Sequence, residues 1–143
     1  MSLVLDCSVT VAWCIDDEAA PETDALLDRV RDEGAVVPML WHLELANVLL
    51  QAERRGRLSV RDVAARLALL DALPIATDDE APGRVRDGVL ALARADRLTA
   101  YDAAYLELAL RTGADLATKD AALEGGAAGW GDDCSREAAV DLA

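Results

Sequence analysis

The chain has 143 residues, enough to bury the core of one domain without disulfide bridges, and we expect a single domain across residues 1–143. Its residues are 53% hydrophobic but only 3% aromatic, with no Phe, which disfavours an all-β sandwich and favours Ala-, Leu- and Val-rich helices packed on a small sheet. The net charge of −13, from 27 acidic and 14 basic residues, argues against binding nucleic acid by overall charge alone and favours a basic partner or a site that attracts cations.

The sequence shows no sign of export or of membrane insertion. No run of about 18 apolar residues is present, which excludes a membrane-spanning helix. The first six residues have no basic flank and too short an apolar stretch for a signal peptide. The cysteines, Cys7, Cys14 and Cys134, are odd in number and form no CxxC pair. We therefore expect a reduced, cytoplasmic protein in which Cys7 and Cys14 are small apolar fillers.

Short strands are predicted to alternate with helices or pairs of helices. In chain order we expect a strand at 3–5, a helix capped by Ser8 and reaching residue 15, a helix that turns Ala25, Leu26 and Val30 inward and ends at Gly34, a strand at 35–38, an amphipathic helix at 39–55, a helix from Ser59 to residue 73, a strand at 73–76, helices at 81–95 and 99–112, and a strand at 114–118. Such alternation predicts a mostly parallel sheet flanked by helices, with its ligand site beyond the carboxyl ends of the strands.

Two acidic residues follow predicted strands directly. Asp6 comes after the first strand, and Asp120 comes after the strand at 114–118. In a parallel sheet both residues lie at the same edge. One such Asp taken alone is more often a turn or cap residue than a ligand.

Two further acidic residues interrupt apolar stripes of predicted helices. Most neighbours of Glu44 at three and four positions away are apolar, and Asp102 repeats this pattern. An unpaired charge there would cost several kcal/mol, and no Arg lies within reach along either helix. A single Glu near a helix start often only complements the helix dipole, but four acids predicted at one edge of the sheet favour a shared cation.

The ligand types available favour a hard divalent ion. Carboxylate oxygens suit Mg²⁺ or Mn²⁺, whereas one His and scattered cysteines exclude a conventional zinc site. An ion held there would make a water nucleophilic near neutral pH and neutralise the leaving oxygen, which is the chemistry of phosphodiester hydrolysis.

The segments that carry these acids resemble the motifs of the PIN-domain family. Asp6-Cys7-Ser8 resembles the opening DxS, and Glu44–Leu49 resembles the second motif, a Glu followed three residues later by Asn. Leu98–Tyr105 is a close match to the third motif, and Thr118–Leu123 resembles the fourth, TxDxxL. Order, spacing and length agree from residue 1 to about residue 124.

The resemblance is to VapC-type toxin ribonucleases of this family. It implies a PIN-like α/β/α sandwich with a small, mostly parallel sheet of four to five strands, and an endoribonuclease that depends on Mg²⁺ or Mn²⁺ and is the toxin of a type II toxin–antitoxin pair. The catalytic metal ligands would be Asp6, Glu44, Asp102 and Asp120. The residues that orient carboxylates or waters would be Ser8, Asn47 and Thr118. The implied partners are RNA, a cognate antitoxin and a second copy of the chain, and the net charge of −13 suits a basic antitoxin tail.

The C-terminal part departs from the family's pattern. After Leu123 the pattern continues with a short helix and an apolar strand, but residues 125–133 are rich in glycine and contain no Val or Ile. We therefore expect residues 125–143 to be atypical, with irregular chain in place of the last strand. Glu124 and Asp132 are expected in solvated loops.

Alternative interpretations remain open. Asp6-Cys7-Ser8-Val9-Thr10 is similar to the DxDxT loop of haloacid-dehalogenase-like phosphatases, although Ser8 replaces the second Asp, which is the general acid there. A catalytically inactive PIN-like module that binds RNA or an antitoxin is another possibility. Three arginines, Arg54, Arg55 and Arg57, either bind RNA or form a solvated helix face. We expect His42 at the surface or in packing, and Trp41 and Tyr101 in the core or a dimer interface.

Overall fold

The fold is built on one parallel sheet. The computed structural model describes residues 3–15, 21–119 and 139–141 of the chain. Within these ranges the sheet has five strands in the order β3-β2-β1-β4-β5, and every neighbouring pair is parallel. The strands are β1 (Leu3–Leu5), β2 (Ala35–Val37), β3 (Ile75–Thr77), β4 (Asp115–Thr118) and β5 (Ala139–Asp141).

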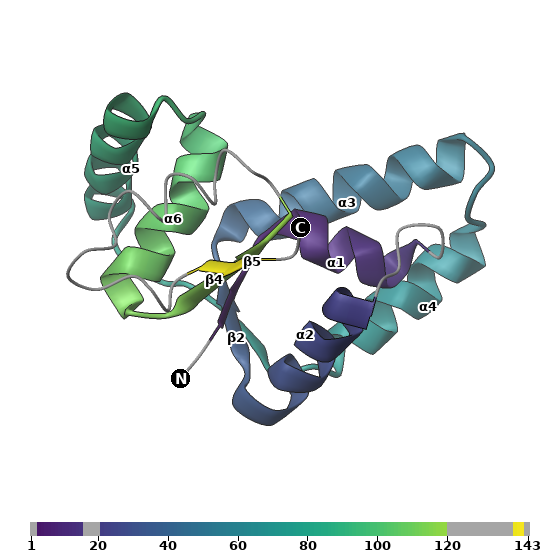
Figure 1. Ribbon diagram of the computed structural model, residues 1–143. Helices are drawn as coiled ribbons and strands as arrows, with labels where there is room; N and C mark the ends of the chain where they lie inside the picture. The colour runs from purple at the N-terminus through teal and green to yellow at the C-terminus, as the bar shows by residue number, and fades with distance from the viewer. Residues whose placement is uncertain (1–2, 16–20, 120–138, 142–143) are drawn as a thin grey trace.

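Helices cover both faces of this sheet. Those in the described ranges are α1 (Cys7–Cys14), α2 (Pro21–Glu33), α3 (Met39–Arg54), α4 (Val60–Asp71), α5 (Pro82–Asp96) and α6 (Ala100–Thr112). Figure 1 shows α5 and α6 packed together on one side of the sheet, α1 and α2 on the other, and α3 extending away from the sheet with α4 returning below it. The predicted α/β/α sandwich is therefore confirmed.

The core is made of aliphatic side chains, as the composition predicts. All three residues of β1 are fully buried, as are Leu49 of α3 and Leu106 of α6. One buried polar contact joins two helices: the Trp41 indole Nε1 donates to Thr10 Oγ1 at 3.1 Å. This contact fixes the start of α3 against α1, since a buried indole N–H needs an acceptor.

Helix ends follow local sequence signals. Ser59 and Asp62 form a capping box at the start of α4, and Thr99 caps α6 by accepting from the Asp102 backbone N–H at 3.1 Å. Gly34 ends α2 at φ +79°, and a Cβ there would lie 3.2 Å from the Pro74 carbonyl oxygen. A residue with a side chain would be both strained and crowded at this position.

Several expectations about local structure are wrong. The N-cap of α1 is Asp6 rather than Ser8, because the helix begins directly after β1. Thr23, rather than Ala25, is buried in α2 together with Leu26 and Val30, because it lies three and seven positions before them on one helix face. Tyr101 is 65% exposed and therefore not in the core.

The C-terminal strand is present. Residues 139–141 form β5, which pairs with β4 in the register Ala117↔Val140. The expected replacement of the last strand by irregular chain is therefore wrong for these residues, because a short edge strand needs backbone pairing rather than a long apolar run. Residues 120–138, including the glycine-rich stretch, lie outside the described residues.

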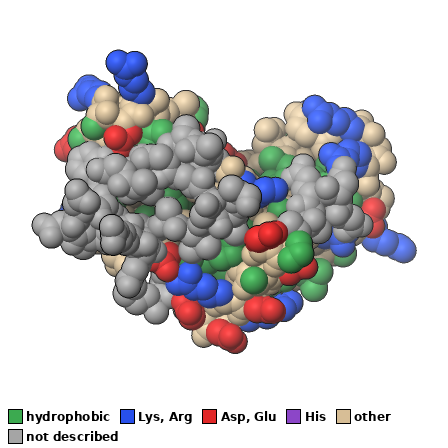
Figure 2. Space-filling model, in the orientation of Figure 1, with side chains coloured by type: hydrophobic (Ala, Val, Ile, Leu, Met, Phe, Trp, Pro, Cys, Tyr) green, Lys and Arg blue, Asp and Glu red, His purple; other side chains and the backbone are tan. Residues whose placement is uncertain are grey.

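Two properties of the described surface bear on function. None of the helices in the described ranges is both long and apolar enough to cross a membrane. Figure 2 shows Lys and Arg side chains gathered over the end of the molecule where α3 meets α4, although the chain as a whole is acidic.

Candidate active site

The candidate site lies where the strand order reverses. From β1 the chain moves to β2 and β3 on one side, and it then returns to place β4 on the other side of β1. Asp6 follows β1 at this point, and its backbone N–H donates to the Ala117 carbonyl oxygen of β4 at 2.9 Å. Ligands of parallel α/β proteins bind outside the carboxyl ends of the strands at such a reversal.

Asp6 is held by two hydroxyl groups. It is only 6% exposed, and its side chain makes no capping bond to α1 although it is the N-cap residue. Its Oδ2 atom accepts from Ser8 Oγ at 2.8 Å and from the buried Thr118 Oγ1 at 2.7 Å. The Lys119 backbone N–H in turn donates to Ser8 Oγ at 3.0 Å. These contacts fix the carboxylate of Asp6 relative to the end of β4.

Glu44 is held from the opposite side of the sheet. It lies on α3, one turn after Trp41, and is half-buried. The hydroxyl of Tyr105, a fully buried residue of α6, donates to Glu44 Oε1 at 2.5 Å. The partner of this carboxylate is therefore a tyrosine from a helix distant in sequence, which the sequence interpretation did not identify.

The electrostatics show carboxylates that repel one another. Burial raises the pKa of Glu44, the hydrogen bond from Tyr105 opposes this, and the negative charges of Asp6 and Asp102 raise it further. Burial and the same carboxylate raise the pKa of the Tyr105 hydroxyl. Burial, followed by Glu44 and Asp6, raises the pKa of Cys7 to about 12, so its thiol stays neutral at physiological pH.

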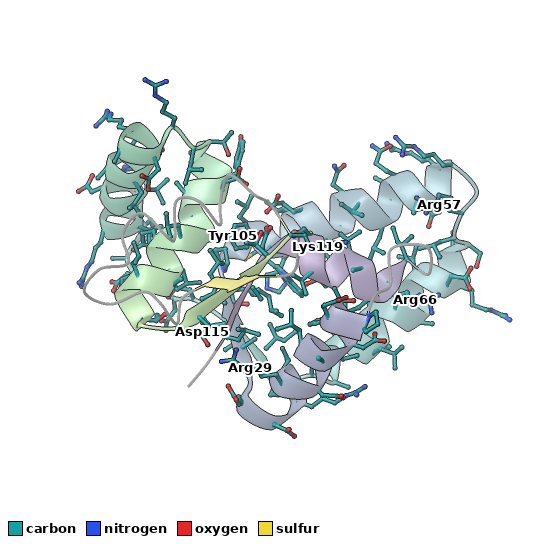
Figure 3. The ribbon with its side chains drawn as sticks, in the orientation of Figure 1. Arg29, Arg57, Arg66, Tyr105, Asp115 and Lys119 are labelled. Atoms are coloured by element: carbon teal, nitrogen blue, oxygen red, sulfur yellow. The ribbon has the colours of Figure 1, made fainter. Side chains whose placement is uncertain are left out.

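Three of the four predicted acids share one cavity. Asp102 lies in the first turn of α6, directly after the Thr99 cap, and is half-buried. The cavity has a volume of about 560 Å³, and its lining residues are Asp6, Cys7, Ser8, Val11, Glu44, Val48, Asp102 and Lys119. Figure 3 shows Tyr105 and Lys119 close together near the centre of the molecule. Asp120, the fourth predicted acid, lies outside the described residues, as do Glu124 and Asp132.

The donor chemistry of this cavity fits a hard divalent cation. Three carboxylates are the ligand type that Mg²⁺ and Mn²⁺ prefer, and a cation would relieve the repulsion that raises the pKa of Glu44. Among the described residues, no three His, Cys, Asp or Glu side chains are already arranged to hold a metal ion. The structure therefore supplies a cavity of the right chemistry, with Asp6, Glu44 and Asp102 as its acidic side chains.

The remaining predicted residues lie elsewhere. Asn47 is exposed and lines a second cavity of about 250 Å³, together with Arg55 and Arg57 but without Arg54. His42 is at the surface, where its Nε2 lies 2.7 Å from Thr77 Oγ1. The structure thus brings Ser8 and Thr118 to Asp6 but places Asn47 beside the acidic cavity rather than in it.

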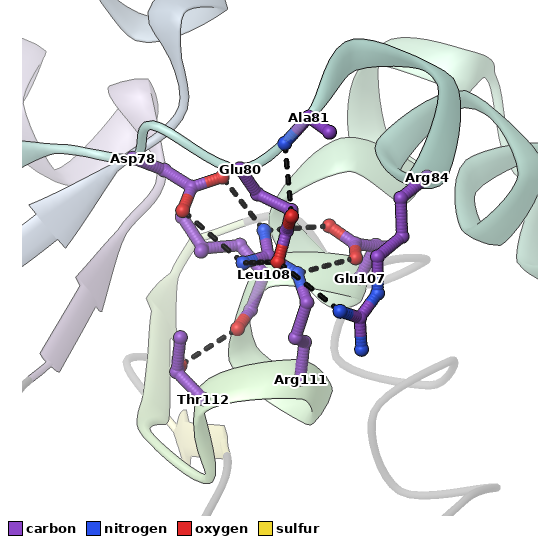
Figure 4. Close-up of polar contacts among 8 residues, drawn as sticks. All are labelled: Asp78, Glu80, Ala81, Arg84, Glu107, Leu108, Arg111 and Thr112. Atoms are coloured by element: carbon purple, nitrogen blue, oxygen red, sulfur yellow. Dashed lines mark hydrogen bonds and ion pairs between the residues drawn. The ribbon is translucent and has the colours of Figure 1, made fainter.

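A second polar cluster lies at the other end of α6. Arg111 donates to Glu107 Oε1 at 2.7 Å and to Asp78 Oδ2 at 2.6 Å, and Glu80 is 3.8 Å away (Figure 4). Hydrogen bonds to Glu107 and Asp78 raise the pKa of Arg111. The cluster joins the segment between β3 and α5 to α6, and so helps to fix the helix that carries Asp102 and Tyr105.

The fold and the site together define a class of protein. A parallel α/β sheet with a carboxylate-lined cavity at its strand reversal suits divalent-cation chemistry on phosphate esters. The PIN domain family matches residues 3–127, and the chain belongs to that family. PIN domains are typically metal-dependent nucleases.

Other comparisons agree with the fold. The chain is similar to the crystal structure of PAE2754 from Pyrobaculum aerophilum, with 22% sequence identity and a TM-score of 0.63. The similarity covers 88% of this chain and 84% of that one, and at this identity it shows the fold alone. A comparison with curated proteins found no significant match.

Proposed function

We propose that this protein is an endoribonuclease that uses Mg²⁺ or Mn²⁺ to hydrolyse RNA phosphodiester bonds, and that it is the VapC-type toxin of a type II toxin–antitoxin pair. One observation carries the proposal: Asp6, Glu44 and Asp102 line the same cavity at the strand reversal of a PIN domain. The resemblance of four motifs to VapC-type toxins supports RNA as the substrate.

Each residue of the site has a proposed role. Asp6, Glu44 and Asp102, with Asp120 as the fourth ligand, would hold the cation. When bound, such an ion supplies Lewis-acid activation of water and neutralises charge that develops on the phosphate.

The remaining residues hold or attract groups in the site. Ser8 and Thr118 fix Asp6 through Oδ2, and Tyr105 fixes Glu44 through Oε1. Lys119 lines the cavity from its exposed rim, where a positive charge would attract the phosphate. Asn47, which the motif resemblance makes a supporting residue, would contact the substrate from the neighbouring cavity rather than orient a carboxylate.

The partners belong to the same proposal. An antitoxin with basic and apolar residues would suit the net charge of −13 and an apolar cavity of about 170 Å³ between α3 and α4, whose lining includes the exposed Leu67. The exposed Tyr101 on α6 is available for a homodimer interface.

Cleavage of structured RNA by the purified protein tests the proposal. We expect products with Mg²⁺ or Mn²⁺, none with EDTA, and none from the Asp6→Asn variant, whereas Asp87→Asn at an exposed position of α5 retains activity. Cleavage that survives both EDTA and Asp6→Asn would contradict the mechanism. Metal-dependent RNA binding without cleavage would indicate the inactive binding module instead. Membership of the PIN family leaves the haloacid-dehalogenase-like phosphatase without support.

A further inference from the structure

A second cavity continues from the acidic one. The two share Val11 and Val48 in their linings, so they adjoin along the surface between α1 and α3. The second cavity has a volume of about 250 Å³, and its lining residues are Val11, Ile15, Asn47, Val48, Gln51, Ala52, Arg55 and Arg57. Figure 3 shows Arg57 at the end of α3 far from Lys119 and Tyr105.

The polar residues of the two cavities follow one stripe of α3. Glu44, Asn47, Gln51 and Arg55 are three, four and four positions apart, a spacing that places them on one helix face. At a rise of about 1.5 Å per residue, the stripe from Glu44 to Arg55 is about 16 Å long. Its charge changes in order from acidic through neutral amides to basic.

This order of side chains suits a single strand of RNA. The acidic end takes a scissile phosphate only together with a cation, whereas guanidinium groups bind phosphate without one, often through two hydrogen bonds. The amides of Asn47 and Gln51 each donate and accept hydrogen bonds, which is what base edges and 2′-hydroxyl groups require. The stripe therefore offers a nucleotide contact between two phosphate contacts.

We propose that the second cavity is a subsite for the single-stranded RNA that flanks the cleaved bond. Arg55 and Arg57 bind a backbone phosphate, and Asn47 and Gln51 contact the adjoining nucleotide. This inference rests on the proposed function, because the acidic cavity fixes the position of the scissile phosphate. It also divides the arginine run of the sequence, since Arg54 is exposed and does not line the cavity.

Salt-dependent binding of a fluorescent single-stranded RNA tests the subsite. The background is Asp6→Asn with Mg²⁺, so that RNA is bound but not cut, and affinity is measured between about 50 and 200 mM salt. Arg55→Ala/Arg57→Ala is expected to weaken binding about tenfold and to reduce the slope of log K against log salt by about 1.4, at about 0.7 for each lost phosphate contact.

The matched control removes the same charge elsewhere. Arg54→Ala/Arg61→Ala changes two exposed arginines near the same helix junction and is expected to leave the slope almost unchanged. Asn47→Ala/Gln51→Ala is expected to weaken binding without changing the slope, because no charge is lost. Thermal unfolding of each variant confirms that it is folded.

The outcomes separate the subsite from the proposed function. Equal losses of affinity and slope in the two arginine double variants would overturn the subsite, even if the wild-type protein cleaves RNA. A selective loss in Arg55→Ala/Arg57→Ala would support the subsite, even if the wild-type protein binds RNA without cutting it. Displacement of RNA from the subsite by a polyglutamate peptide at equal concentration would assign the cavity to an acidic protein partner and overturn the proposal.

Discussion

Tyr105→Phe removes one oxygen atom and with it the hydrogen bond to Glu44 Oε1. Tyr105 is fully buried and Glu44 half-buried, so water cannot simply replace the donor. A hydrogen bond to a charged group contributes about 1.5–3 kcal/mol. If that energy orients Glu44 as a metal ligand, its loss lowers the affinity for Mn²⁺ by about 10- to 100-fold, the range expected when a partner of a metal ligand is removed.

The loss should depend on pH in a defined direction. The bond from Tyr105 lowers the pKa of Glu44 against burial and against the charges of Asp6 and Asp102, so the substitution raises that pKa further. Metal must then displace a proton from Glu44, and the loss of affinity is larger at mildly acidic than at mildly alkaline pH.

Calorimetric titration with Mn²⁺ at the two pH values measures both effects. Tyr101→Phe is the matched control, because Tyr101 lies on the same helix but is 65% exposed, and it should bind Mn²⁺ like the wild-type protein. Tyr105→Phe protein that is folded and binds Mn²⁺ with wild-type affinity at both pH values would refute the role given to Tyr105.

Further predictions concern pH, thiols and the polar cluster of α6. Without metal, the raised pKa of Glu44 means that the folded chain binds its proton more tightly than the unfolded chain, so this group's contribution to stability is lost as pH rises from about 4.5 through the raised value. Urea unfolding should show this slope in wild type and not in Glu44→Gln. Cys7, buried and with a pKa of about 12, should react with iodoacetamide only as fast as the protein unfolds, and rapid modification of native protein would be inconsistent with its burial. Arg111→Ala leaves Glu107, 7% exposed, without its cation and should cost about 3 kcal/mol of unfolding free energy; Arg84→Ala, which breaks an exposed ion pair, should cost less than about 1 kcal/mol.

Local signals predicted most of the secondary structure. Leu3–Leu5 is apolar throughout because β1 is buried on both faces, and Ser59 and Thr99 start helices because their side chains accept hydrogen bonds from backbone N–H groups. Gly34 and Gly113 end helices at positive φ, a conformation that glycine adopts without strain. Because the strands are parallel, these elements were enough to place Asp6 at the edge where the cavity lies.

Contacts between distant residues were not predictable in the same way. Tyr105 and Glu44 are 61 positions apart, and the sequence interpretation sought a partner for Glu44 only along its own helix. A signal was present: Tyr105 lies three positions after Asp102 in an apolar stripe, where a buried hydroxyl needs a polar partner. Asn47 shows the opposite case, since its position after Glu44 suggested a shared site but the structure places it in the adjoining cavity.

Anomalous diffraction from crystals soaked in Mn²⁺ would locate the ion on which the proposed chemistry depends. We expect a peak in the cavity between α1, α3 and α6, bonded to carboxylate oxygens of Asp6, Glu44 and Asp102, and no such peak in crystals of Asp6→Asn. Mn²⁺ bound only at other places on the surface, with these three side chains unliganded, would contradict the metal-dependent mechanism.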